Sequence, residues 1–236
     1  MQIATHGILA SSASAVASFS NVKSLDFDGV DDYVAISSSS GLAFTGDFSL
    51  VAWIKADSIG SNMYVVDTST SATTGNGYSF RVLTTGKVRF WSYSASHNLI
   101  DSATTLSAGT WYHIAVVHNS TQNKIYINGS LDATQNWTTG HNTSNTANLR
   151  IGSSQILGGA FNGHIDEVAF FNSDQSSNIA TIYNSGSPAD LTSLSPISWF
   201  RNGDGDTFPT LTDNGSASNN GTMTNMTSGD IVTDVP

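Results

Sequence analysis

The stretch that decides the fold is Phe161-Asn162-Gly163-His164-Ile165-Asp166-Glu167-Val168-Ala169-Phe170-Phe171-Asn172. Its bulky apolar side chains predict a strand, and we expect the rest of the chain to be arranged around it. The acidic pair Asp166-Glu167 lies in the middle of this strand, and Glu167 is the only glutamate of the protein. A carboxylate in such apolar surroundings is costly unless a cation, a backbone donor or another partner satisfies it. What satisfies Asp166 is therefore the main functional question that the sequence poses.

Strand and turn signals recur along most of the chain. Residues 48–54 are apolar on both faces, which is typical of a central strand, and residues 111–118 predict a buried one. About a dozen short strands follow one another at a spacing of roughly 8 to 12 residues. Only residues 173–184 predict a helix, with Ser173 as its N-cap. The pattern predicts an all-β fold, a sandwich of antiparallel sheets with one short late helix.

Residues 78–84 and 88–93 predict a hairpin around Thr85-Gly86-Lys87. A three-residue loop would pair Val82 with Phe90 and separate two sets of side chains. The apolar set is Phe80, Val82, Val88 and Phe90, and the opposite set is Arg81, Arg89, Trp91 and Tyr93. Because a slip by one residue would mix the sets and bury an arginine, this segregation favours the three-residue loop.

The composition excludes several classes of partner. The 236 residues carry 8 Lys and Arg against 18 Asp and Glu, a formal net charge of -10. Because the basic residues form no stripe, we expect no binding to nucleic acid or to an anionic membrane surface. No apolar run reaches the ~18 to 20 residues of a membrane span. The sequence has no Cys, which excludes disulfides and thiolate metal sites.

Three segments follow from the pattern. Residues 1–21 are small and weakly apolar, and they predict either a flexible N-terminal arm or an arm that orders against a partner. Residues 22–186 carry the regular strands, and residues 187–236 form a C-terminal segment. Residues 1–20 contain no Lys or Arg, which does not favour a signal peptide. We therefore expect a protein made in the cytoplasm that assembles into something larger.

Five motifs occur in the order of a known family. They are Ser24-Leu25-Asp26-Phe27-Asp28-Gly29-Val30-Asp31-Asp32-Tyr33-Val34, Phe48-Ser49-Leu50-Val51-Ala52-Trp53-Ile54, Trp111-Tyr112-His113-Ile114-Ala115-Val116, Tyr126-Ile127-Asn128-Gly129 and Gly163-His164-Ile165-Asp166-Glu167-Val168. The ordered set resembles the laminin-G-like modules of the concanavalin A-like lectin and glucanase superfamily, over residues 22–186. The resemblance implies a jelly roll of two curved antiparallel sheets.

The C-terminal segment departs from the order of that family. A segment like residues 197–205 usually comes before the module, whereas here Ser198-Trp199-Phe200, Asp213-Asn214-Gly215 and Asn219-Asn220-Gly221-Thr222-Met223 come last. One interpretation is a circular permutation, in which residues 187–236 supply the edge strands of their own sandwich. A second is donation of these strands to a neighbouring subunit, because unpaired sheet edges recruit strands. A third is an extended tail without either role.

The sequence as a whole, including residues 199–226, also resembles laminin-G-like proteins of tailed phages that infect marine bacteria. Those proteins are regarded as virion structural or decoration proteins. This resemblance implies a homo-oligomeric component on the surface of the phage particle. Its termini would attach it to capsid or tail proteins, and its loops could adhere to glycans of the host surface. The alternative is a stand-alone, extracellular carbohydrate-binding lectin-like module. A degenerate glycan hydrolase is a further alternative.

The same superfamily often holds one structural calcium ion. The resemblance implies that Asp166 is a ligand, with a backbone carbonyl from Gly29 and a carboxylate from Asp28 or Asp31. Such oxygen donors suit Ca²⁺, which takes 6 to 8 of them. The alternative is that Asp166 accepts backbone N–H groups or pairs with a lysine.

The sequence does not favour catalysis. The glucanases of the superfamily carry a Glu-x-Asp-x-Glu motif on one strand, and this chain has a single Glu. Retaining glycosidases need two carboxylates about 5 to 5.5 Å apart. The six His form no His-Glu-x-x-His pair, and no Gly-x-Ser-x-Gly motif occurs. We therefore expect no enzymatic activity and no catalytic residue.

Glycan binding is the remaining chemistry, because sugars stack on aromatic rings and are fixed by amides and hydroxyls. The outward face of the predicted hairpin offers a platform of Arg89, Trp91 and Tyr93, followed by His97 and Asn98. Trp137, in a polar loop, could be a second contact. The alternative is that these aromatic residues pack under a loop or against a subunit.

Overall fold

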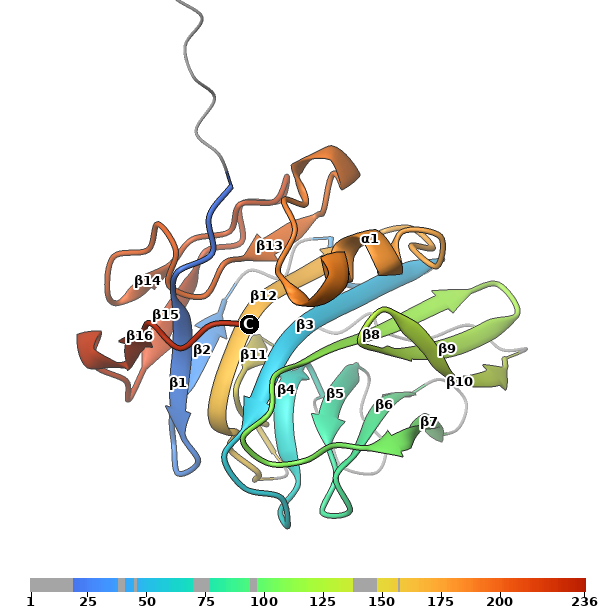
Figure 1. The fold of residues 1–236 in the computed structure, drawn as a ribbon, viewed down its shortest axis with the longest axis horizontal. Helices are drawn as coiled ribbons and strands as arrows, with labels where there is room; N and C mark the ends of the chain where they lie inside the picture. Colours follow the sequence, from blue (N-terminus) through green and yellow to red (C-terminus); the bar gives the residue numbers. More distant parts are fainter. Residues whose placement is uncertain are drawn as a thin grey trace, which may run out of the picture.

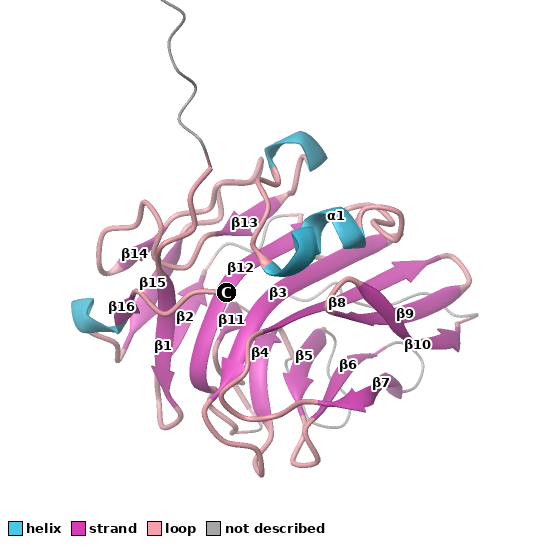
Figure 2. Ribbon diagram, viewed as in Figure 1, coloured by secondary structure: helices cyan, strands magenta, loops and turns pink. Residues whose placement is uncertain are grey.

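The computed structural model describes residues 19–37, 41–44, 46–69, 77–93, 97–137, 148–156 and 158–236, except for the side chains of Tyr93 and His97. Two eight-stranded antiparallel sheets pack face to face, and short helices lie on the outside (Figure 1). Strands and loops make up nearly all of the chain in Figure 2. The predicted all-β sandwich with one short late helix is therefore confirmed.

The bounds of the strands are given in their spatial order. The first sheet runs β10 (Ser130–Asn136), β9 (Gln122–Ile127), β8 (Tyr112–Asn119), β3 (Phe48–Ala56), β12 (Asn162–Phe171), β1 (Ser24–Asp28) and β16 (Ile231–Val232), with β13 (Ser198–Phe200) also paired to β12. The second sheet runs β14 (Thr210–Leu211), β15 (Gly221–Thr224), β2 (Tyr33–Ile36), β11 (Leu149–Ile151), β4 (Met63–Asp67), β5 (Tyr78–Val82), β6 (Lys87–Tyr93) and β7 (His97–Thr105).

The core lies between the two sheets. Successive side chains of a strand point to opposite faces, so each sheet contributes every second residue to this layer. Phe80 and Phe90 are fully buried from the second sheet, and Leu25 and Ile165 from the first. The near-parallel rings of Phe44 and Phe48, with centroids 4.7 Å apart, fill one end of the core.

Strand β12 organises the first sheet, as the sequence predicts. It pairs with β3 along one side and with β1 and then β13 along the other. Its register with β3 shifts between Asp166 and Ala169, which is the signature of a β-bulge. Glu167 lies in this bulge with a φ of 49°, an uncommon conformation for a residue other than glycine.

The helix is shorter than predicted. Helix α1 (Ile179–Tyr183) is followed by the 3₁₀ turn η1 (Asn184–Gly186), and two more 3₁₀ turns are η2 (Thr192–Leu194) and η3 (Ser228–Asp230). Ser173 does not cap the helix, because the helix begins at Ile179 with Asn178 at its N-cap position. The Ser173 hydroxyl accepts Gln175 Nε2 at 2.8 Å instead. Ile179 and Ile182 cover the outer face of the first sheet.

The hairpin of β5 and β6 keeps the predicted faces but not the predicted pairs. Phe80 lies opposite Phe90 and Val82 opposite Val88, a shift of two residues from the expected register. The loop closes one residue earlier, since the backbone N–H of Gly86 donates to the carbonyl of Leu83 at 2.8 Å. Because side chains alternate with a period of two, this shift leaves both faces unchanged.

The C-terminal segment pairs with the sheets of its own chain. Strand β13 lies beside β12, β16 beside β1, and β15 beside β2 with β14 beyond it. In this structure residues 187–236 thus pair within their own sandwich, and the circular permutation of the family order stays a prediction.

We therefore expect Leu211→Ala to destabilise the whole sandwich. Leu211, on β14, is fully buried in the core, and truncating a buried leucine costs about 2–5 kcal/mol. Leu131 on β10 is 55% exposed, so Leu131→Ala is a matched control that should change stability by less than about 0.5 kcal/mol. Urea unfolding of both variants measures the difference. Equal, small effects would show that the C-terminal strands are not part of the core.

Candidate functional site

A cleft of about 210 Å³ opens where three loops meet, the β1–β2 loop, the segment after β11 and the turn after β15. Its lining residues are Val30, Asp31, Tyr33, Arg150, Ser153, Ser154, Gly158, Gly159, Ala160 and Asn225. The set combines an aromatic ring, a cation, a carboxylate, an amide and hydroxyls. Such a mixture of one flat surface with a few convergent polar groups is typical of small-ligand sites.

A stacked pair, Tyr33 and Arg150, lies at this cleft. The guanidinium carbon of Arg150 lies 4.0 Å from the centroid of the Tyr33 ring. The register explains this contact, because Arg150 is paired with Ala35 and Tyr33 is two residues from Ala35 on the same face of β2. Outside its strand pairing, the Arg150 guanidinium forms no hydrogen bond or ion pair with any residue that the structure describes. Its N–H donors are therefore available to a ligand.

Three further residues shape the walls of the cleft. The Ser153 hydroxyl is buried and has no hydrogen-bond partner within the described ranges. Asn225 donates through Nδ2 to the carbonyl of Asp31 at 3.1 Å, which ties the turn after β15 to the β1–β2 loop. A side chain at Gly159 would lie 2.4 Å from the carbonyl oxygen of Asn62, so only glycine fits this wall.

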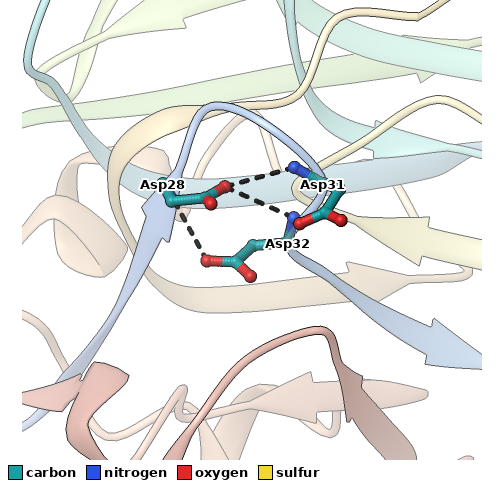
Figure 3. A group of neighbouring side chains, drawn as sticks. All are labelled: Asp28, Asp31 and Asp32. Carbon is teal, nitrogen blue, oxygen red and sulfur yellow. Dashed lines mark hydrogen bonds between the residues drawn. The ribbon is translucent and has the colours of Figure 1, made fainter.

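Three carboxylates gather beside the cleft. Figure 3 shows Asp28, Asp31 and Asp32, whose candidate ligand oxygens lie within 4.8 Å of one another. Asp28 Oδ1 accepts the backbone N–H of Val30 at 2.7 Å, and Asp32 Oδ2 accepts that of Asp28 at 3.1 Å. Burial raises the pKa of Asp32. The Asp31 carboxylate accepts no hydrogen bond from a described residue, so this oxygen-donor set fits a hard cation such as Ca²⁺.

The predicted calcium ligands need one correction, because Asp166 does not belong to this group. Asp28 faces Asn162 on β12, and Asp166 lies four residues further along that strand. At about 3.3 Å per residue, Asp166 lies roughly 13 Å along the strand from Asn162, the residue that Asp28 faces. Gly29 stays beside the acidic cluster, in a turn with a φ of 74°, and packs against the Asn162 side chain.

If Ca²⁺ binds to the acidic cluster, it should raise the melting temperature by a few degrees, because a ligand of the folded state stabilises it. Asp31→Asn should abolish the rise, since it removes a carboxylate that accepts no hydrogen bond from a described residue. Asp166→Asn is the control and should keep the rise. Thermal melts with Ca²⁺ and with a chelator measure the difference. A rise retained in Asp31→Asn, or no rise in the unmodified protein, would contradict calcium binding at this cluster.

Asp166 is satisfied inside the protein by hydrogen bonds. It is fully buried, and its carboxylate accepts Asn21 Nδ2 at 2.8 Å and the backbone N–H of Glu167 at 2.8 Å. Glu167 accepts the indole N–H of Trp199 and Arg201 Nε, the latter at 3.2 Å. Burial, and next the charge of Glu167, raise the pKa of Asp166 well above its usual value. Burial likewise raises the pKa of Glu167 to about 7.

These raised pKa values predict that the protein loses stability as the pH rises from about 5 to about 8. A carboxyl whose pKa is higher in the folded state stabilises the fold below its ordinary pKa, and this stabilisation is lost as the pH rises through the folded value. We expect the melting temperature to fall by several degrees between about pH 5 and about pH 8. Glu167→Gln, which cannot ionise, should flatten the decline. An equally steep decline in this variant would contradict the assignment to Glu167.

The predicted glycan platform is not an exposed surface. Trp91 is 8% exposed and Trp137 is 5% exposed, so neither ring offers a free face. Arg89 forms a two-bond ion pair with Asp101, at 2.6 and 2.7 Å. Asn98 is half-buried, and the side chains of Tyr93 and His97 lie outside the described residues. The structure therefore agrees with the alternative in which the tryptophans are packed.

The platform and the cleft nevertheless share one side of the second sheet. The ladder pairs Arg150 with Asp67, Asp67 with Ser79, and Ser79 with Trp91. Paired residues point to the same face, so these four side chains form a row across β11, β4, β5 and β6. Trp91 lies three strands, or about 14 Å, from Arg150.

Sequence reasoning missed Tyr33, Arg150, Ser153 and Asn225. One local signal was present, because Arg150 stands between two apolar residues of β11 and must therefore point outward. The pairing of β11 with β2, which brings Arg150 to Tyr33, has no local signal in the sequence.

The comparisons with known proteins agree with this architecture. Residues 28–179 match the family described as the concanavalin A-like lectin/glucanases superfamily, and the chain belongs to that family. No curated protein matches it. No helix within the described ranges is long and apolar enough to cross a membrane.

Among solved structures, a candidate carbohydrate-binding protein from Bacteroides ovatus matches with a TM-score of 0.69 and 19% identity, over 89% of this chain and 60% of that protein. This chain thus spans less than two thirds of that relative. The CBM40 module of the Ruminococcus gnavus IT-sialidase, bound to alpha2,3 sialyllactose, matches with a TM-score of 0.58 and 12% identity, over 70% and 100% of the two chains. A heptameric pentraxin from Limulus polyphemus matches with a TM-score of 0.52 and 16% identity, over 69% and 82%.

Proposed function

We propose that this chain is a non-enzymatic carbohydrate-binding module whose ligand sits in the cleft beside Tyr33 and Arg150. The observation that carries the proposal is the stacked Tyr33–Arg150 pair, whose guanidinium has no hydrogen bond or ion pair to a described side chain. The lectin-like and carbohydrate-binding structures that share the fold support it.

The chemistry of the cleft suits a sugar ring. Arg150 covers one face of Tyr33, so the flat surface offered to a ligand is the guanidinium plane with N–H donors around its rim. Asp31 and Ser153 also line the cleft, so their carboxylate and hydroxyl oxygens are the candidates to bond to sugar hydroxyls. A volume of about 210 Å³ is below the 300–1,000 Å³ of sites for drug-sized ligands, so the cleft suits one sugar unit rather than a long oligosaccharide.

The local charge favours a neutral sugar at this site. Arg150 shares the cleft with Asp31, whose carboxylate lies in one group with those of Asp28 and Asp32, and the whole chain carries a net charge of -10. An anionic sugar would be repelled by this acidic loop, whereas hydroxyl groups can donate to carboxylates and accept from Arg150.

A binding role fits the cleft better than hydrolysis. Asp31 is the one acidic residue that lines it in the described part of the chain, and glycoside hydrolysis by the usual routes uses two carboxyl groups. Glu167, the only glutamate, is buried under Trp199 at the bulge of β12.

Attachment to a phage particle is a separate, second proposal, which rests on the resemblance of the sequence to laminin-G-like proteins of tailed phages. Since β13 to β16 pair within the chain, attachment through residues 187–236 would have to use their exposed loops. The N-terminal arm, residues 1–21, is the other attachment segment, and only residues 19–21 of it are described. Mass spectrometry of purified virions tests this placement, and absence of the chain from particles would exclude it.

Glycan binding should depend on Arg150 and Tyr33. We expect Arg150→Ala and Tyr33→Ala each to weaken binding of a neutral glycan by about tenfold or more, because a charged hydrogen-bonding group or its stacking partner is lost. Arg89→Ala is the matched control, since Arg89 lies on the same sheet but is paired with Asp101. A glycan array identifies the ligand, and calorimetry measures the affinities.

Two results would contradict the proposed site. The first is an array without any bound glycan for the unmodified protein. The second is a loss in Arg89→Ala as large as that in Arg150→Ala, which would move binding to the hairpin face.

A further inference from the structure

A cluster of nitrogen donors surrounds one carboxylate on the outer face of the first sheet. Lys55 forms an ion pair with Asp234, and the indole Nε1–H of Trp111 donates to Asp234 Oδ1 at 2.9 Å. His164 lies between two carboxylates, with Nε2 3.8 Å from Asp234 Oδ2 and Nδ1 3.9 Å from Asp26 Oδ1. The bond from Lys55 lowers the pKa of Asp234, so this carboxylate stays ionised. In Figure 1 the end of the chain, marked C, accordingly lies over β12 and β3.

The strand register builds this cluster. Lys55 on β3 lies opposite His164 on β12, and His164 lies opposite Asp26 on β1. Trp111 directly precedes Tyr112, which is paired with the neighbour of Lys55 on β3. The donors therefore form a row across adjacent strands and do not depend on residues 233–236 for their placement.

The side chains of Lys55 and His164 are more deeply buried than the Asp234 side chain that they contact. The side chains of Lys55 and His164 are only 15% and 12% exposed, whereas that of Asp234 is 45% exposed. The Asp234 carboxylate thus enters a preformed site from the solvent side. The Lys55 ammonium also lies over the Trp111 ring, 5.8 Å from its centroid, so the cation and the ring belong to one cluster.

The site recognises a carboxylate rather than a peptide main chain. It lies on the face of a sheet, where the backbone groups of the strands already bond to one another, and a peptide needs a free sheet edge to pair. Among the residues described, the one hydrogen bond to the main chain of Asp234 comes from the Ser24 hydroxyl. A carboxylate next to a flat apolar ring is instead the chemistry of an acidic sugar, whose ring can pack on the indole.

We propose that Lys55, Trp111 and His164 form a second binding site, for the carboxylate of an acidic sugar such as a uronic acid, and that Asp234 occupies this site as an internal ligand. The sugar must displace Asp234, which competes at an effective concentration in the millimolar range for a short tether. The proposal is independent of the Tyr33–Arg150 cleft, which lies at the second sheet and which we assign to neutral sugars.

NMR of the indole N–H signals tests this site with glucuronate as the probe. The protein has five Trp, and the signal missing in Trp111→Phe is that of Trp111. In Asp234→Asn, added glucuronate should shift this signal and bind at least about tenfold more tightly than in the unmodified protein, because the charged competitor is gone. Lys55→Met in the Asp234→Asn background should lose the response. A melting curve of each variant confirms folding.

The controls separate the possible outcomes. Glucose should leave the Trp111 signal in place, and acetate should bind more weakly than glucuronate because it has no ring. Equal affinity for acetate would overturn the assignment to a sugar, and no response of Asp234→Asn to glucuronate would overturn the site. Arg150→Ala should not change the response, so failure here is distinguishable from failure of the cleft.

Discussion

The structure depends on burying the pair Asp166-Glu167 at the bulge of β12. Two adjacent carboxyl groups inside a sheet are tolerated only if their oxygens find donors and part of their charge is removed. The donors come from both ends of the described chain, Asn21 before β1, and Trp199 and Arg201 at β13. The acidic pair therefore joins the N-terminal and C-terminal segments at the central strand.

The bulge also marks the point where β12 changes partner. Its pairing with β1 reaches Ile165, and its pairing with β13 begins at Val168. Strand β1 runs away from the bulge toward Asp28, where the β1–β2 loop forms one wall of the cleft. The acidic pair and the cleft thus lie at opposite ends of β1. The pair fixes the position of the strand, and the cleft offers the groups that a ligand can reach.

The sequence predicts the fold well because local alternation and motif order specify it. The faces of the β5–β6 hairpin are correct even though its register is shifted by two, since face depends only on parity. The site is predicted poorly, because it depends on distances between strands that are remote in sequence. Motif order placed Asp166 near Gly29 without showing that they lie at different ends of β1. Alternation also places Trp91 outward, yet it is buried.

The chain has few positively charged side chains, so the contacts of each one indicate whether it is available to a ligand. The chain has only eight Lys and Arg, and every described arginine except Arg150 has a hydrogen-bonded partner. Arg150 is held by stacking alone, so its hydrogen-bonding capacity can serve a ligand, whereas Lys55 already holds a carboxylate in the form of Asp234. Since one group belongs to the second sheet and the other points outward from the first, a small sugar cannot span both. In a protein with a net charge of -10, the two proposed sites would therefore distinguish neutral from acidic sugars by where each cation is placed rather than by the overall field.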